Sequence, residues 1–534
     1  MARNIFLASL IAAATATYAD FSGPAPLAWR WSQATTVSPN GPIVAESGVV
    51  YAAVGGRVYA VDQESGNGKW RFPSGAPIES GNFKTGVLAT STMIVAAVDN
   101  KIVYGIDKET GAQKWQYISP EKVIGTPVSV GNFVALQLGD SSIMVLNAAD
   151  GSAAWERPVK FLDGIVGQIA GFREMVIFGT QGDKIYAWDV VTKKQAWVQR
   201  LGRFNAEFKP VVYNDNIYCV NSDFLSVISG ANGTRRWERN LRGTGKYFAS
   251  VNQFGSAAVT GDGLVTVFDP SGREVFKKAV DLGSSSSAAP VLTSSVVAIP
   301  TANGAVNLLD SKTGAVKWDF VVRPLVATLP AGAEAGGSSG KGGGPGGFGS
   351  PGGGGGAQTT DEAPKYVTAA AAPVISGDAL LLLARDGSML SFDAVNGVDL
   401  TPPSVKMVFP NPGDAVNGQP PLQLFFKIAD EASGLNTKTL KVTINGQEYE
   451  SRLTNDGYVI VKFSGGKNQP LMDGRKEIKV SVSDWLGNAA NQSFFLTIDN
   501  ALSPIKLPGS DTNDPAQGGG KGGGKGKGGG FGGG

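Results

Sequence analysis

The chain has 534 residues, with 47 lysines and arginines against 45 aspartates and glutamates, one cysteine and no histidine. It is too long for one ordinary core unless a repeat architecture carries it, and its balanced charge favours neither nucleic acid nor an acidic substrate as partner. Without histidine, the chain has no Ser-His-Asp or Cys-His nucleophile system and no imidazole ligand for a metal. The lone Cys219 forms no internal disulfide, and in the β-rich run NIYCVNS we predict it to be a small buried apolar residue.

The N-terminus indicates the compartment. Residues 1–19, MARNIFLASLIAAATATYA, combine a basic residue, Arg3, with an apolar stretch and then small residues up to Ala19. This pattern predicts a secretory signal peptide, and its apolar stretch is too short to span a bilayer. Because no cysteine lies near the predicted cleavage site, we expect no lipid anchor. We therefore expect an exported protein that does not span the membrane and that resides in the periplasm, the cell envelope or the extracellular space.

The main feature of the sequence is a repeated turn. Its copies are spaced by about 40–45 residues, except that the last step is about twice as long. They begin at Asp62, Asp107, Asn147, Asp189, Ser229, Asp269, Asp310 and Asp393. In six copies a tryptophan follows eight residues after the first turn residue, in the copy at Asp269 Phe276 takes its place, and the last copy has no aromatic residue.

Short β-rich segments precede each turn, as GPIVAES, VVYAAV and VYAVD do before the first one. Together with the segment after the turn they make four short strands without helical periodicity, which predicts one blade of a β-propeller. The eighth copy lacks a matching fourth strand, whereas the N-terminal PLAWRWSQ resembles the fourth strand GKWRF of the first copy. We therefore predict an eight-bladed propeller over residues 20–403, with four-stranded blades and with the ring closed by the N-terminal strand.

The best-preserved copies are AVDQESGNGKW at residues 60–70 and GIDKETGAQKW at residues 105–115. They resemble the tryptophan-docking repeat of the PQQ-like propellers. This resemblance implies that the aromatic residue packs flat against the neighbouring blade and has a structural role. We expect that role for Trp31, Trp70, Trp115, Trp155, Trp197, Trp237, Phe276 and Trp318.

Two branches of this superfamily differ in chemistry. The quinoprotein dehydrogenases bind pyrroloquinoline quinone (PQQ) and calcium, and the resemblance to them implies adjacent, disulfide-linked cysteines, or C-x-x-C-H in the haem-containing relatives. This chain has one cysteine and no histidine. The other branch is the non-catalytic BamB-like propeller of outer-membrane β-barrel assembly. We therefore expect no catalytic residue, no bound cofactor and no metal site, with PQQ and calcium as the alternative.

Three further segments complete the chain. Residues 331–365 include GGSSGKGGGPGGFGSPGGGGG, which we predict to be a disordered insertion in the propeller. Residues 404–500 contain alternating strands and the segment VSDWLGNAANQSFFLTID, which resembles the last hairpin of bacterial Ig-like domains and predicts a β-sandwich. Residues 501–534 form a Gly/Lys-rich tail that we predict to be disordered and capable of weak contact with anionic surfaces.

The fold class predicted is thus all-β, and the function predicted is that of an exported, non-catalytic scaffold. Its partners would be envelope or cell-surface proteins, as in BamB-like outer-membrane protein assembly, and not nucleic acid. Two alternatives remain open: a PQQ-dependent oxidoreductase, and a protein that binds a surface polymer or carbohydrate. The turns DEASG and DWLGN offer oxygen atoms for calcium, but neither has the spacing of an EF-hand, and ordinary turn chemistry explains both.

Overall fold

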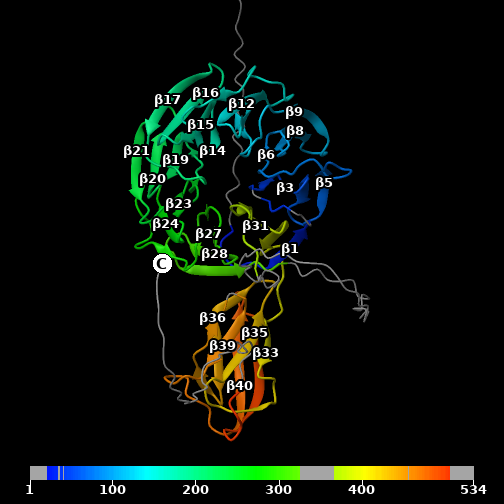
Figure 1. Ribbon diagram of the computed structural model, residues 1–534, viewed down its shortest axis with the longest axis vertical. Coiled ribbons are helices and arrows are strands. Elements are labelled where there is room, and N and C mark those ends of the chain that lie inside the picture. The colour runs from blue at the N-terminus through cyan, green and yellow to red at the C-terminus, as the bar shows by residue number, and fades with distance from the viewer. Residues whose placement is uncertain (1–20, 34–36, 40, 325–365, 455, 506–534) are drawn as a thin grey trace, which may run out of the picture. The chain divides into compact units, whose positions relative to one another are not determined.

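The computed structural model describes residues 21–33, 37–39, 41–324, 366–454 and 456–505 (Figure 1). The predicted signal peptide, the Gly-rich insertion at 331–365 and most of the predicted tail lie outside these residues. Every regular element in the described part of the chain is a β-strand. A search of the same residues for a helix long and apolar enough to cross a membrane found none.

Eight four-stranded antiparallel sheets follow one another around a ring and form the blades of a propeller (Figure 1). The first four blades contain β2 (Val44–Glu46), β3 (Val49–Val54), β4 (Arg57–Asp62) and β5 (Gly68–Phe72); β6 (Leu88–Ala89), β7 (Met93–Ala97), β8 (Ile102–Asp107) and β9 (Gln113–Ile118); β10 (Val128–Val130), β11 (Phe133–Gln137), β12 (Ser142–Asn147) and β13 (Val159–Lys160); and β14 (Ile165–Phe172), β15 (Met175–Thr180), β16 (Lys184–Asp189) and β17 (Lys194–Arg200).

The second half of the ring repeats this order. Blades 5 to 8 contain β18 (Val211–Tyr213), β19 (Asn216–Asn221), β20 (Phe224–Ser229) and β21 (Arg235–Asn240); β22 (Ser250–Asn252), β23 (Gly255–Val259), β24 (Leu264–Phe268) and β25 (Val280–Asp281); β26 (Val291–Leu292), β27 (Val296–Pro300), β28 (Ala305–Asp310) and β29 (Val316–Val321); and β30 (Val374–Ser376), β31 (Ala379–Leu383), β32 (Ser388–Asp393) and β1 (Leu27–Ser32). The predicted eight blades are confirmed.

The N-terminal strand closes the ring, as predicted. Strand β1 pairs antiparallel with β32 and forms the outer strand of blade 8. Its register corrects one expected residue. Trp70 pairs with Ala60, two residues before the turn at Asp62, and the equivalent partner in blade 8 is Ser391, which pairs with Trp29. Trp29, and not Trp31, therefore holds the docking position.

Trp29 also makes the contacts of a docking residue. Its indole N–H donates a hydrogen bond to the carbonyl of Gln63, 2.9 Å away, and its ring lies against Gly66, where an added Cβ would be 2.7 Å from the ring. Trp31 has a different role, because its ring packs edge-on against Tyr59 with a centroid distance of 4.8 Å. Alternate residues of a strand point to opposite faces of the sheet. Trp29 and Trp31 are two residues apart, so they point to the same face but contact different residues.

The docking aromatic residues of the other blades lie at the joints between neighbouring blades. Trp70 is representative: its indole N–H donates to the carbonyl of Lys108 at 3.0 Å, and its ring lies against Gly111 in the next turn. Gly111 has φ +72°, a conformation that favours glycine. Glycines of later turns lie in the same way against Trp115, Trp197 and Trp237, whereas Gly314 lies closer to Val280 than to the ring of Phe276.

Two blades depart from this pattern. The turn that receives Trp155 has Lys193 at the glycine position, with φ +57°, and the indole of Trp155 donates to the carbonyl of Val190 at 2.8 Å. In blade 7, Trp318 donates to the carbonyl of Ser433, far outside the propeller repeats. The docking side chain is buried at five joints and half-buried for Trp29, Trp70 and Trp237, and a fully buried large aromatic side chain stabilises its joint by about 2–3 kcal/mol.

The chain divides into two compact units. The first comprises Met1–Ser404, Ala429–Leu440 and Ser481–Ala490, and the second comprises Val405–Ile428, Lys441–Val480 and Asn491–Gly534. Two short segments that follow the propeller in sequence thus belong to the propeller unit. Trp485 is one of their residues, and it packs against the core that joins blades 7 and 8.

The strands after the propeller form two further sheets, and these fit the predicted Ig-like domain. Strand β35 shows why, because Leu424, Phe426 and Ile428 are buried while the residues between them are partly exposed, as expected for one face of a sandwich. One sheet has the order β33 (Ser404–Phe409), β35 (Gln423–Ala429), β39 (Tyr458–Lys462) and β38 (Arg452–Leu453); the other has β34 (Ala415–Val416), β41 (Ala489–Ile498), β40 (Gly474–Asp484), β36 (Leu435–Ile444) and β37 (Gln447–Tyr449).

Candidate functional site

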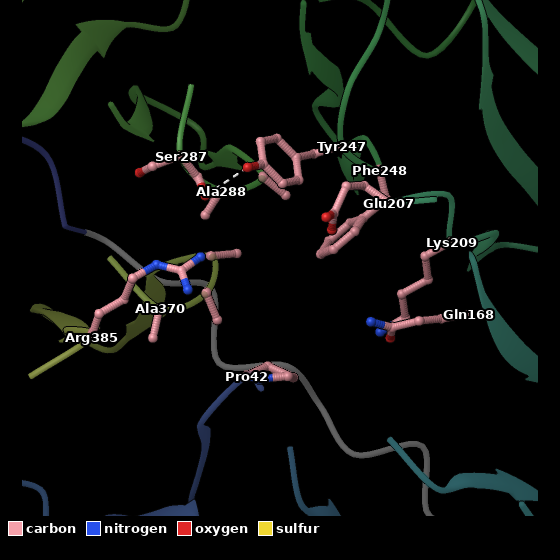
Figure 2. Close-up of a pocket in the computed structure, with 13 residues that line it drawn as sticks. Pro42, Gln168, Glu207, Lys209, Tyr247, Phe248, Ser287, Ala288, Ala370 and Arg385 are labelled. Carbon is pink, nitrogen blue, oxygen red and sulfur yellow. Dashed lines mark hydrogen bonds between the residues drawn. The ribbon is translucent and has the colours of Figure 1, made fainter. Parts of the chain in front are cut away.

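The inner strands of the blades surround a pocket of about 110 Å³ at the axis of the propeller (Figure 2). Its lining comes from segments that are widely separated in sequence: Pro42, Gln168, Glu207, Lys209, Tyr247, Phe248, Ser287, Ala288, Ala289, Ala370, Ala371, Ala372 and Arg385. Most of these residues come just before the first strand of a blade, so they lie on one face of the ring. We call this face, which carries the blade-to-blade links such as 119–127 and 161–164, the link face.

A second, larger chamber of about 470 Å³ continues from this pocket. The two share Pro42, Lys209, Phe248 and Ala372. The second chamber is lined mainly by prolines, alanines and valines at the start of the inner strands, among them Val128, Val211, Val251, Val291 and Val374. Lys209 is the one charged residue in its described lining. The larger chamber is thus apolar with one cationic side chain, whereas the smaller pocket adds polar and charged groups such as Glu207 and Arg385.

Lys209 is partly buried between blades 5 and 6. Its ammonium lies 5.2 Å from the centroid of the Phe248 ring, a cation–π contact. None of the ion pairs and hydrogen bonds found among the described residues involves this ammonium. Burial lowers the pKa of Lys209, because a charged amine is poorly solvated in an apolar surrounding.

Hydrogen bonds hold the wall beside Lys209 in place. The hydroxyl of Tyr247 donates to the carbonyl of Ser287 at 2.7 Å (Figure 2), and the ammonium of Lys246 donates to the carbonyl of Ser286 at 3.2 Å. These bonds connect the first segments of blades 6 and 7. Arg385, in the turn between β31 and β32, and Glu207 are both exposed at the mouth of the pocket. The positive charge of Arg385 and the negative charge of Glu207 balance one another, so Lys209 carries the one charge of the described lining that no opposite charge balances.

The channel does not fit a quinone–calcium centre. Calcium takes about 6–8 oxygen ligands, usually several carboxylates, whereas Glu207 is the one carboxylate in the described lining of either chamber. Cys219 is not near this site: it lies in β19, fully buried, and burial raises the pKa of its thiol. A buried thiol of this kind behaves as a small apolar side chain, in line with its expected role.

Three carboxylates converge elsewhere in the propeller unit. One oxygen each of Asp399, Asp430 and Asp484 lies within 4.8 Å of the others. Oδ1 of Asp430 accepts hydrogen bonds from the backbone N–H groups of Ala432, Ser433 and Gly434, and Asp399 accepts from the backbone and the hydroxyl of Ser433. Burial and the two neighbouring carboxylates raise the pKa of Asp430.

These aspartates perform the turn chemistry expected of DEASG and DWLGN. Both oxygens of Asp484 accept hydrogen bonds from Asn488, and the amide of Asn488 donates to the carbonyl of Asp399 at 3.0 Å. The three side chains therefore order the segments 429–440 and 481–490 on the propeller. The sequence predicted each turn, but it did not predict that the three aspartates converge, because they come from segments about 30–90 residues apart.

The link face carries a group of exposed aliphatic side chains. Leu162 is 96% exposed, Ile118 70% and Ile124 54%. Their loops are nevertheless held by backbone hydrogen bonds: the N–H of Ile124 donates to the carbonyl of Gln137 at 3.0 Å, and that of Phe161 to Ser141 at 3.0 Å. Large exposed apolar patches are a feature of interaction surfaces.

The sequence placed its candidate residues at the blade joints, and these residues do not line the channel. Trp188 packs against Phe161 at a centroid distance of 5.1 Å, in the core that joins blades 2, 3 and 4. The sequence-based expectations did not include the residues that line the channel. A signal for them does exist, since proline precedes or begins several inner strands, at Pro42, Pro127, Pro210, Pro290 and Pro373.

A family model described as "Outer membrane protein assembly factor BamB" matches residues 27–164 and 159–323, more than half of the chain. The chain belongs to this family of PQQ-like propellers. The resemblance to the tryptophan-docking repeat is confirmed. No curated protein sequence matches the chain.

Solved structures share the fold at low identity. Quinohemoprotein alcohol dehydrogenase ADHIIG from Pseudomonas putida HK5 has a TM-score of 0.51 and 13% identity, over 76% of this chain and 81% of that one. BamB from Moraxella catarrhalis has a TM-score of 0.49 and 12% identity, over 69% and 99%. The computationally designed Ika8 protein has 0.49 and 13%, over 70% and 99%. At 12–13% identity these likenesses concern the fold alone.

Proposed function

We propose that this protein is a non-catalytic propeller of the cell envelope that binds a protein partner through its link face, in the assembly of outer-membrane proteins. Membership of the BamB family supports this proposal. The channel supports it too, because its described lining offers a single carboxylate, Glu207, and no histidine. General acid–base or metal-assisted oxidation needs more donors than these.

The observation that carries the proposal is the exposure of Ile118, at the end of β9, and of Ile124 and Leu162 on ordered loops of the link face. Burying such side chains at an interface is favourable by about 25 cal/mol per Å² of apolar surface. Their loops connect successive blades, so the rigid ring fixes their positions and little order is lost on binding. A partner with an apolar strip fits this surface.

The test is recovery of the partner from the envelope fraction. The protein is cross-linked in cells, purified, and its bound proteins are identified. We expect β-barrel assembly proteins with the wild type, and a loss of about tenfold or more with Ile124→Asp combined with Leu162→Asp. Val191→Asp is the matched control, because Val191 is an exposed aliphatic residue in a turn between β16 and β17, on the opposite face.

Two outcomes would overturn this function. One is equal recovery of assembly proteins by the wild type and the Ile124→Asp/Leu162→Asp variant, with circular dichroism showing that both are folded. The other is recovery of glycan or polymer in place of those proteins, as the surface-binding alternative predicts. Incubation with PQQ and calcium tests the enzymatic alternative, for which we expect neither a quinone absorption band nor alcohol-dependent reduction of a dye.

A further inference from the structure

We propose that the propeller channel binds a single-chain carboxylate, with the carboxylate on the ammonium of Lys209 and an apolar tail along the valine-lined chamber. Its lining includes none of Ile118, Ile124 and Leu162, so the site stands or falls independently of the function proposed above. It is built from blades 1 and 3 to 8, since residues from each of these blades line one or both chambers.

Lys209 carries an unpaired charge in this channel. Lys209 lines both chambers and takes part in none of the ion pairs or hydrogen bonds that the described residues make, apart from its cation–π contact with Phe248. Keeping a charge in an apolar surrounding is unfavourable unless an opposite charge pairs with it. A ligand carboxylate supplies that charge and a short, charge-assisted hydrogen bond.

The lining of the larger chamber is suited to an apolar tail. Apart from Lys209, its polar side chain is Ser250, whose hydroxyl already accepts a hydrogen bond from the N–H of Leu292 at 2.9 Å. The remaining walls are proline, alanine, glycine, valine and Phe248. An uncharged aliphatic chain matches these walls, because no polar wall group loses a water partner when the chain enters.

The charges around the channel favour a head group with a single negative charge. One ammonium balances a single negative charge, and the opposite charges of Glu207 and Arg385 at the mouth supply no further net positive charge for a second one. A carboxylate is therefore preferred over an alkyl phosphate dianion. The tail contributes by burial, at about 0.8 kcal/mol per methylene, which corresponds to a threefold to fourfold gain in affinity for each added carbon until the chamber is full.

Calorimetry on the purified full chain tests the site, with butanoate, hexanoate, octanoate and decanoate below their micelle concentrations. We expect one ligand per chain and affinity that rises with tail length. Lys209→Gln should weaken octanoate binding by about tenfold or more, while Lys209→Arg should retain most of it. Lys122→Gln, at an exposed lysine of the link face, is the matched control and should bind like the wild type.

Octanol, octyltrimethylammonium and octyl phosphate complete the set of probes. We expect all three to bind more weakly than octanoate. Saturable binding of octanoate that Lys209→Gln leaves unchanged would overturn the proposal, and so would the absence of binding to the wild type or a preference for octyl phosphate. Urea denaturation verifies that Lys209→Gln is folded, which we expect because the substitution removes a poorly solvated charge.

Discussion

The indole N–H of Trp318 donates a hydrogen bond to the backbone carbonyl of Ser433, 2.8 Å away and 115 residues later in the chain. In other blades the same position contacts the turn of the next blade. In blade 8 the turn glycine, Gly397, lies against Pro26 instead, and the carbonyl that Trp318 needs comes from the segment Ala429–Leu440. This contact helps to explain why that segment belongs to the propeller unit.

Loss of this hydrogen bond should be measurable. Trp318→Phe keeps a ring but leaves the Ser433 carbonyl unpaired in a buried place, and should lower the free energy of unfolding by about 1–3 kcal/mol. Trp188→Phe is the matched control, because the buried Trp188 indole N–H has no hydrogen-bond partner in the described structure. Urea denaturation compares the two. Equal losses would show that the bond to Ser433 contributes nothing.

The contact between a docking ring and a turn glycine predicts a second effect. An alanine Cβ at Gly111 would lie 2.7 Å from the Trp70 ring, whereas one at Gly48 would meet nothing within 4 Å; the two glycines have φ +72° and +75°. The backbone cost of about 1–2 kcal/mol is therefore common to Gly111→Ala and Gly48→Ala. We expect Gly111→Ala to lose about 1–3 kcal/mol more, through overpacking.

Thermal or urea unfolding of these two variants measures the difference. It isolates the ring contact because the strain at φ cancels between them. If both glycine variants lost the same stability, blade docking would not depend on a close approach of backbone and indole.

The blades were predictable because each repeat carries its own local signals. Asp107 shows this: its carboxylate accepts hydrogen bonds from the N–H groups of Glu109 and Thr110, within the same turn. Register was harder to predict. Trp29 and Trp31 point to the same face of β1, and only the pairing with Ser391 or Met389 decides which of them reaches the next blade.

The channel could not be predicted in the same way. Lys209 and Arg385 lie 176 residues apart in number, and the closure of the ring brings both to one pocket. In the sequence, Lys209 looks like any other lysine before a strand. Its lack of an ionic partner depends on what the other blades place around it, so only the assembled propeller reveals it.

Burial of Cys219 predicts that its thiol reacts slowly with disulfide reagents. The thiol is fully buried in β19, and burial raises its pKa, so neither access nor ionisation favours attack. We expect a disulfide reagent to leave the native protein unlabelled on the time scale in which it labels urea-unfolded protein completely. Rapid stoichiometric labelling of the native protein would contradict this burial.

The last prediction concerns Asp319 in β29. Burial raises the pKa of this carboxyl to about 6, and the nearby Lys438 opposes the shift. In the unfolded chain an aspartate titrates near pH 3.9. Between about pH 4 and 6 the folded protein therefore keeps a proton that the unfolded chain has lost, and the free energy of unfolding falls as pH rises through this window.

An asparagine side chain does not ionise, so Asp319→Asn should remove the fall in the free energy of unfolding that accompanies ionisation of Asp319. We expect the variant to be more stable than the wild type by on the order of 2 kcal/mol at neutral pH, with the difference shrinking towards about pH 4.

Asp107→Asn should change stability in the opposite direction. The hydrogen bonds from Thr110, with Lys114, lower the pKa of Asp107 to about 2, so its stabilisation is present at neutral pH and is lost as pH falls below about 4. Urea denaturation across this pH range measures both effects, and an advantage of Asp319→Asn that does not change with pH would show that the carboxyl is not destabilised by ionisation.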